Sequence, residues 1–104
     1  MKELTSHNFD QEVSQNALVL VDFYADWCGP CSMLADLLKQ VTNELPVKVG
    51  KLDVERNDDI TERFRITRLP TLVFFKDGAE VQRMVGMTSK TELQNLVTHF
   101  AGQH

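Results

Sequence analysis

The chain has 104 residues, of which 42% are hydrophobic and 25% charged, the proportions of one soluble globular domain. A chain of this size buries roughly 60–70% of its unfolded surface, so it can form a core without cross-links or a metal. Its net charge is −4 and it carries no basic stripe, which argues against nucleic acid as the main partner.

We expect a cytoplasmic protein with no membrane partner. The N-terminal residues Met1–Asn8 lack the apolar core of a signal peptide. The longest apolar runs, such as Leu18–Val21 and Leu72–Phe75, are too short to span a bilayer. Persistent structural disulfides are rare in the cytoplasm, so a lone pair of cysteines there is expected to be catalytic or metal-binding.

The first third of the chain predicts a strand, a short helix and a second strand. Residues 2–4 are expected to form a short edge strand, and Thr5 to cap a helix that ends near Gln15. The run Leu18–Tyr24 is apolar on both faces, which indicates a central strand.

A long second helix is predicted from Pro30, whose fixed φ suits a first turn, to the break at Pro46. Its apolar residues recur at helical spacing and predict one buried stripe: Met33, Leu34, Leu37, Leu38, Val41 and Leu45. A strand over residues 47–54 follows, which completes a parallel strand–helix–strand unit with a right-handed crossover.

The last part of the chain predicts a short helix opened by Asn57 or Asp58, and then a hairpin. The strands Thr71–Lys76 and Glu80–Val85 flank Asp77-Gly78, a strong hairpin signal.

A final helix closes the chain, beginning at a capping box of Ser89 and Glu92 and stopping at Gly102. Its inward side chains are expected to be Leu93, Leu96, Val97 and Phe100. We therefore predict a single α/β domain over residues 1–104 with a mixed sheet.

The segment Trp27-Cys28-Gly29-Pro30-Cys31 holds the only two cysteines of the chain. Because it lies between a predicted strand and a predicted helix, the first sulfur is expected at a helix N-terminus. Unpaired backbone N–H groups and the helix dipole there favour the thiolate, which is the form that attacks a disulfide.

The cysteine spacing predicts a two-step reduction. Cys28 is expected to be the exposed nucleophile that attacks a client disulfide, and Cys31, one turn deeper, to displace the client by closing a 28–31 bridge. The alternative is half of a zinc site. A closed zinc site needs four ligands, and the three histidines lie near the chain ends without ligand spacing: His7, His99 and His104.

This motif and the order of elements resemble the thioredoxin family along essentially the full length of the chain. The supporting segments are Val21–Ala25, Lys51–Val54, Leu69–Thr71, Phe75–Gly78 and Val85-Gly86. The resemblance implies a thioredoxin fold, with a five-stranded mixed sheet, made of a parallel N-terminal unit and a C-terminal hairpin, flanked by four helices.

The resemblance also implies a monomeric protein-disulfide oxidoreductase that reduces disulfides in client proteins. Its partner would be a thioredoxin reductase, commonly a flavoenzyme drawing on NADPH. The chain itself has no G-x-G-x-x-G fingerprint, and no cofactor is expected beyond the redox-active disulfide of Cys28 and Cys31.

Asp22 shares a strand face with Leu18 and Leu20, so we expect it to be buried and its pKa to be raised by desolvation. In the family the matching aspartate lies beneath the cysteines and assists proton transfer to and from the second sulfur, here Cys31. The alternative is a hydrogen-bonded core aspartate without a kinetic role. Lys51 matches the family lysine that modulates this aspartate, although from the residues it is equally a solvated strand lysine.

The resemblance implies a substrate-binding surface made of Trp27, Gly29, Pro30, Leu69, Pro70 and Gly86. Pro70 would be a cis-proline facing the disulfide, the backbone of Leu69 would pair with an extended client segment, and Gly86 would let that segment approach closely. The same surface supports an alternative function, a binding module that holds a partner without redox chemistry.

The chain departs from the family pattern at several positions near the motif. Ser32 replaces the common basic residue after the second cysteine, and Asp36 replaces a helix-kinking proline. Arg65 and Arg68 stand where glycine is frequent, and with Arg63 they predict a positive rim that favours acidic partners, or else an ordinary solvated cluster.

Overall fold

The computed structural model describes residues 1–102, in which five strands form one mixed sheet of order β1-β3-β2-β4-β5. Their bounds are β1 (Lys2–Leu4), β2 (Leu18–Tyr24), β3 (Lys48–Asp53), β4 (Thr71–Lys76) and β5 (Ala79–Val85). β3 is parallel to both β1 and β2, whereas β4 is antiparallel to both β2 and β5. The predicted central position of Leu18–Tyr24 and the C-terminal hairpin are confirmed.

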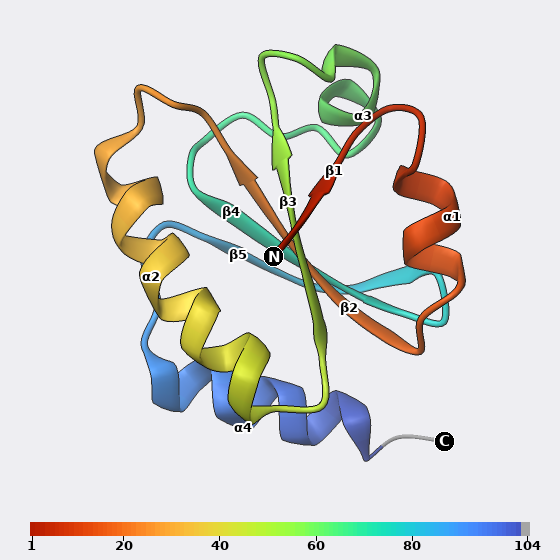
Figure 1. Cartoon of the computed structure of the whole chain (residues 1–104), viewed down its shortest axis with the longest axis vertical. Helices are drawn as coiled ribbons and strands as arrows, with labels where there is room; N and C mark the ends of the chain where they lie inside the picture. The colour runs from red at the N-terminus through yellow and green to blue at the C-terminus, as the bar shows by residue number, and fades with distance from the viewer. Residues whose placement is uncertain (103–104) are drawn as a thin grey trace.

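Four helices cover the sheet: α1 (Phe9–Ser14), α2 (Gly29–Glu44), α3 (Asp58–Arg63) and α4 (Lys90–Ala101). In Figure 1, α2 and α4 lie to the left of the sheet and below it, and α1 and α3 lie to its right and above it. The α/β class with a mixed five-stranded sheet and four helices is confirmed. None of the helices within residues 1–102 is long and apolar enough to cross a membrane.

Alternation along β2 divides the interior into two cores. Leu18 and Leu20 point toward α2 and α4, where they pack with Leu34, Leu38, Val41, Val49, Leu72, Phe74, Leu93, Val97 and Phe100. Val19, Val21 and Phe23 point to the opposite face and pack with Leu4, Phe9, Val13, Leu52, Ile60, Val73 and Phe75. β2 is therefore buried on both faces, and Asp22 belongs to the α2/α4 face by parity.

The first helix begins later than predicted, at Phe9 rather than just after Thr5. Thr5 instead starts a turn: its carbonyl accepts from the amides of Asn8 and Phe9, and its own amide donates to Asn8 Oδ1 at 2.7 Å. Because these groups close the turn, Thr5 does not cap α1.

The buried stripe of α2 is confirmed for Leu34, Leu38 and Val41, but not for Met33, whose exposed fraction is 66%. Met33 directly precedes Leu34 near the start of the helix, and it is not among the side chains that pack in either core. Helical spacing alone does not fix where a buried stripe ends.

The predicted Asp77-Gly78 hairpin turn forms in full, whereas the predicted capping box of Ser89 and Glu92 forms only in part. Asp77 and Gly78 both take positive φ, 50° and 89°, as a two-residue hairpin turn requires. Ser89 caps α4 by accepting from the Glu92 amide at 3.1 Å. The Glu92 carboxylate accepts from the Thr88 hydroxyl instead, so only half of the capping box forms.

Candidate active site

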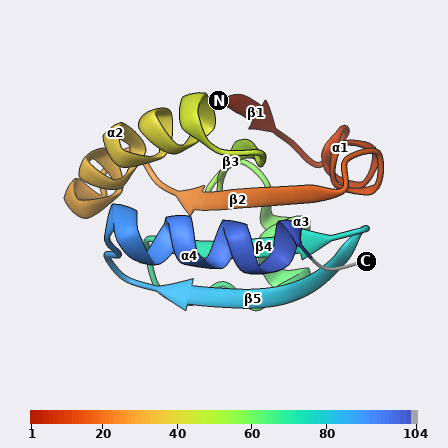
Figure 2. The same cartoon turned by 90° about the horizontal axis from the view of Figure 1, so that it is seen from below.

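Strand register brings three loops together at one end of the sheet. Thr71, the first residue of β4, pairs with Phe23 near the end of β2 and with Val85 at the end of β5. The cysteine segment after β2, the Leu69-Pro70 segment before β4 and Gly86 after β5 therefore emerge at the same edge. Figure 1 and Figure 2 both show this edge on the left, where α2 and α4 also begin.

Cys28 and Cys31 form a disulfide, with their Cα atoms 5.3 Å apart. Cys28 is the N-cap of α2, with extended backbone angles, and Pro30 lies in the first turn. The predicted strand-to-helix junction is confirmed. Released by reduction, the Cys28 sulfur would face the unpaired N–H groups of the helix start.

Cys28 is not exposed as predicted, because its exposed fraction is 5%, close to the 4% of Cys31. In the oxidised protein the bridge turns each sulfur against the other. The amide of Cys28 also donates to the Ala25 carbonyl at 3.1 Å, which holds the residue against the end of β2.

Asp22 lies in the interior, with an exposed fraction of 1%. Its Oδ1 accepts no hydrogen bond from any residue the structure describes. Burial raises the pKa of this carboxyl to about 7, and the nearby Lys51 ammonium acts in the opposite direction. The expected burial and the direction of the pKa shift are confirmed.

A cavity of about 170 Å³ joins this carboxyl to the disulfide. Its walls are Asp22, Tyr24, Ala25, Asp26, Cys31, Ser32, Ala35 and Lys51. Asp22 from β2, Lys51 from β3 and Cys31 from α2 are thus brought to one space. A carboxyl with a pKa near neutrality that shares a cavity with a cysteine is suited to proton exchange with it.

The predicted substrate-binding residues lie in the segments that meet at this end of the sheet, and one of them, Pro70, is buried. Trp27 has an exposed fraction of 70%, and the Leu69–Pro70 bond is cis. The Gly86 amide donates to the Pro70 carbonyl at 2.8 Å, which ties the two loops together. The Leu69 backbone forms no hydrogen bond with another backbone group in residues 1–102, so it is free to pair with an extended segment.

Two exposed methionines that are near the site in the sequence, Met33 and Met87, were missed by the sequence analysis as candidate binding residues. Met87 follows Gly86, and Met33 lies two residues beyond Cys31. Methionine is flexible and polarisable, which suits it to contacts with varied partners. Apolar spacing alone does not separate such an exposed methionine from a core one.

The predicted positive rim is incomplete. Arg63 pairs with Asp10 at 2.7 Å, and its guanidinium lies over the rings of Phe9 and Phe64. Arg63 therefore binds to α1 and does not contribute to a rim with Arg65 and Arg68. Arg65 and Arg68 are exposed, and neither makes an ion pair with another residue of the described chain.

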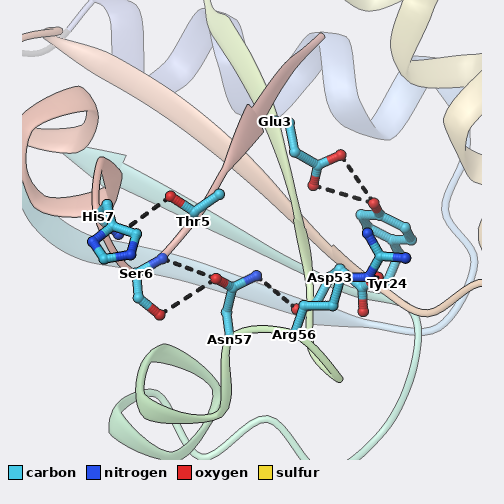
Figure 3. Close-up of a pocket in the computed structure, with 8 residues that line it drawn as sticks. All are labelled: Glu3, Thr5, Ser6, His7, Tyr24, Asp53, Arg56 and Asn57. Atoms are coloured by element: carbon cyan, nitrogen blue, oxygen red, sulfur yellow. Dashed lines mark hydrogen bonds and ion pairs between the residues drawn. The ribbon is translucent and has the colours of Figure 1, made fainter.

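A second, larger cleft of about 330 Å³ lies between the start of the chain and the end of β3 (Figure 3). Two buried polar residues line it, Asp53 and Asn57, and Asn57 is satisfied internally: Oδ1 accepts from the Ser6 amide at 2.9 Å, and Nδ2 donates to the Asp53 carbonyl at 3.0 Å. These bonds hold the loop before α1 to the loop before α3, which is a structural role. Within residues 1–102 no three His, Cys, Asp or Glu side chains are grouped to hold a metal ion.

Comparison with known proteins agrees with this arrangement, since the thioredoxin family model matches residues 1–99. The chain belongs to the thioredoxin family. A thioredoxin from Chlamydia pneumoniae is 44% identical over 102 residues, covering 97% of this chain and 99% of the relative. One from Listeria monocytogenes is 38% identical over 102 residues, covering 96% and 98%.

Solved thioredoxin structures are also similar. A mutant thioredoxin from Halobacterium salinarum superposes with a TM-score of 0.93 at 33% identity, covering 99% of this chain and 92% of that one. The oxidised thioredoxin from Plasmodium falciparum gives 0.85 at 35% identity, covering 98% and 99%. With the bridged Cys28 and Cys31, these matches make the chain a protein-disulfide oxidoreductase. Thioredoxins need no cofactor besides this disulfide.

Proposed function

We propose that this thioredoxin-family chain works as a reductase, with Cys28 as nucleophile and Cys31 as resolving thiol. The Cys28 thiolate attacks one sulfur of a client disulfide and forms a mixed disulfide, and the other client sulfur leaves as a thiolate that takes a proton. Cys31, deprotonated, then attacks the Cys28 sulfur. The second client sulfur leaves, two electrons have passed to the client, and the 28–31 bridge remains.

Asp22 is the acceptor of the Cys31 proton in the second step. Its support is the cavity that Asp22 and Cys31 share, together with a pKa of about 7 that lets the carboxyl gain or lose a proton near neutral pH. Lys51, on the same cavity, modulates this carboxyl as a nearby cation. No other ionisable side chain is buried on this cavity wall among the described residues.

The client binds on the surface formed by Trp27, Gly29, Pro30, Leu69, Pro70 and Gly86. An extended client segment adds to the free backbone of Leu69, and exposed Trp27 supplies apolar contact area. Gly86, with φ of 91° and open space beside its Cα, leaves room for that segment.

Electrons return to the pair from a thioredoxin reductase, which docks on the same surface and attacks the 28–31 bridge. The chain acts as a monomer in the cytoplasm. The bridge at the start of α2, beside a buried carboxyl, is the observation that carries the proposal.

The reducing direction is tested by equilibrating the protein with glutathione at known ratios and measuring the bridged fraction by Trp27 fluorescence. We expect the Cys28–Cys31 couple to have a reduction potential clearly more reducing than that of glutathione; an oxidising potential would overturn the reductase assignment.

A Cys28→Ser/Cys31→Ser double variant tests the alternative of a binding module. Full biological activity of that variant would favour the module over the reductase.

A further inference from the structure

Three side chains of alternating charge form a row across β1, β3 and β2. Lys51 on β3 is the register partner of Glu3 on β1 and of Asp22 on β2. Register partners project from the same face of a sheet and lie close together. One ammonium therefore lies between two carboxyl groups, an exposed one at the sheet edge and a buried one that shares a cavity with Cys31.

The ammonium lies on the Glu3 side of this row. Lys51 Nζ is 3.8 Å from Glu3 Oε1, whereas no ion pair joins Lys51 to Asp22, both of which the structure describes. Asp22 Oδ1 is left without a hydrogen-bond partner among the residues that the structure describes. The buried carboxyl, which would gain most from a cation, does not hold this one.

Tyr24 holds both members of the Glu3–Lys51 pair. Its hydroxyl donates to Glu3 Oε1 at 3.0 Å and lies 3.1 Å from Oε2 (Figure 3). Lys51 Nζ lies over the Tyr24 ring, 5.3 Å from its centre, where the π face attracts a cation. Burial, and then the Glu3 contact, raise the pKa of Tyr24 above its usual range, so the hydroxyl stays a donor at neutral pH.

We propose that Glu3, anchored by Tyr24, is a positioning residue that competes with Asp22 for the Lys51 ammonium and so keeps the buried carboxyl able to bind a proton. The inference rests on the proposed role of Asp22 as proton acceptor. It deepens that role by assigning the control of Asp22 to an edge-strand residue on the far side of Lys51.

The other groups around Asp22 do not supply this control. Lys51 is the cation that faces it, from β3. Asp26, after β2, also lines the cavity, but it is exposed, so solvent screens its charge. Tyr24 stays neutral, and α2 presents Cys31, which is bridged in the oxidised protein. On the β4 side the register partner of Asp22 is Leu72, which carries no charge. Moving the Lys51 ammonium is therefore the direct way to change the protonation of Asp22.

The test is a Glu3→Gln variant, in which the amide oxygen still accepts from the Tyr24 hydroxyl but the charge is gone. The carboxyl carbon of Asp22 is followed by NMR against pH in the oxidised protein. We expect the variant to lower the midpoint of the Asp22 titration by about 0.5 to 1 pH unit, because Lys51 is released toward Asp22. An unchanged or higher midpoint would overturn the proposal.

Two matched variants separate competition for Lys51 from a general change of charge. In a Lys51→Met background the effect of Glu3→Gln should fall to less than half, since no ammonium remains to be released. Glu80→Gln, at a carboxylate on β5 paired with Arg83, should leave the Asp22 midpoint unchanged. A full effect in the Lys51→Met background, or an equal effect of Glu80→Gln, would refute the competition.

This titration reads Asp22 directly and needs no client. It can therefore fail while Asp22 still takes the Cys31 proton, and it can succeed while kinetics of an Asp22 variant refute that role. The two proposals are tested separately.

Discussion

Asp22 and Cys31 line one cavity, the first from the central strand β2 and the second from the first turn of α2. The carboxyl has no hydrogen-bond partner for Oδ1 among residues 1–102, and it is almost fully buried. Burying a carboxyl without such a partner is unfavourable, and more so when it is ionised. A side chain that destabilises the fold in this way is expected at a functional position.

The first prediction concerns stability. The folded-state pKa of Asp22, about 7, lies above the ordinary value of about 3.9, so the folded state binds this proton more tightly than the unfolded state. The stability that this proton provides is fully present below pH 4 and is lost as the pH rises through 7. Asp22→Asn should therefore change the free energy of unfolding little at pH 4 and raise it at pH 8 by up to about 4 kcal/mol. Urea unfolding at several pH values measures this. A difference between the two proteins that is constant with pH would contradict it.

The second prediction concerns rate. Asparagine cannot accept a proton, so Asp22→Asn should slow the attack of Cys31 on the mixed disulfide by roughly 10- to 100-fold, and leave the first attack by Cys28 nearly unchanged. Rapid quenching of a single turnover, followed by separation of the mixed disulfide, resolves the two steps. Equal slowing of both steps would show that Asp22 acts on the fold or on Cys28 instead.

The third prediction concerns client docking at Gly86. Its φ is 91°, so alanine there should destabilise the protein by roughly 1–2 kcal/mol. The added Cβ would meet no atom of residues 1–102 within 4 Å, but it would point into the space proposed for the client. Gly86→Ala should therefore also raise KM for a protein disulfide several-fold, with kcat nearly kept.

Gly78 provides the matched control, because its φ is 89° and it lies in the hairpin turn at the opposite end of β5. Gly78→Ala should lower stability by a similar amount and leave KM unchanged. If both alanine variants raise KM equally, the effect comes from lost stability and not from docking.

Much of the fold was predictable because it is encoded locally. The two-faced apolar run of β2 and the Asp77-Gly78 turn each contain their own signal, and both were predicted correctly. The start of α1 was missed because the choice between a cap and a turn at Thr5 depends on its hydrogen bonds with Asn8. Met33 was misplaced because its exposure depends on which apolar side chains of α2 the rest of the fold covers, and helical spacing does not specify that.

Some residues of the candidate site could likewise be predicted from the local sequence, and others could not. The cysteine motif and Asp22 were found from residue type and spacing. Glu3 was not found, because its place beside Lys51 is set by the register of β1 against β3, two strands far apart in the chain. No local pattern marks such a residue. The burial of Cys28 was also missed, since it follows from the closed bridge and not from the sequence around it.

The most direct test of the account is covalent trapping of a disulfide client such as insulin, analysed on non-reducing gels and by mass spectrometry. Cys31→Ser keeps the nucleophile and removes the resolving thiol, so it should accumulate a mixed disulfide through Cys28. Cys28→Ser should accumulate none, because Cys31 lies within the first turn of α2 and lines the inner cavity with Asp22, whereas Cys28 stands at the N-cap of the helix. A complex formed by folded Cys28→Ser protein, or none formed by folded Cys31→Ser protein, would contradict the assignment of Cys28 as the attacking sulfur.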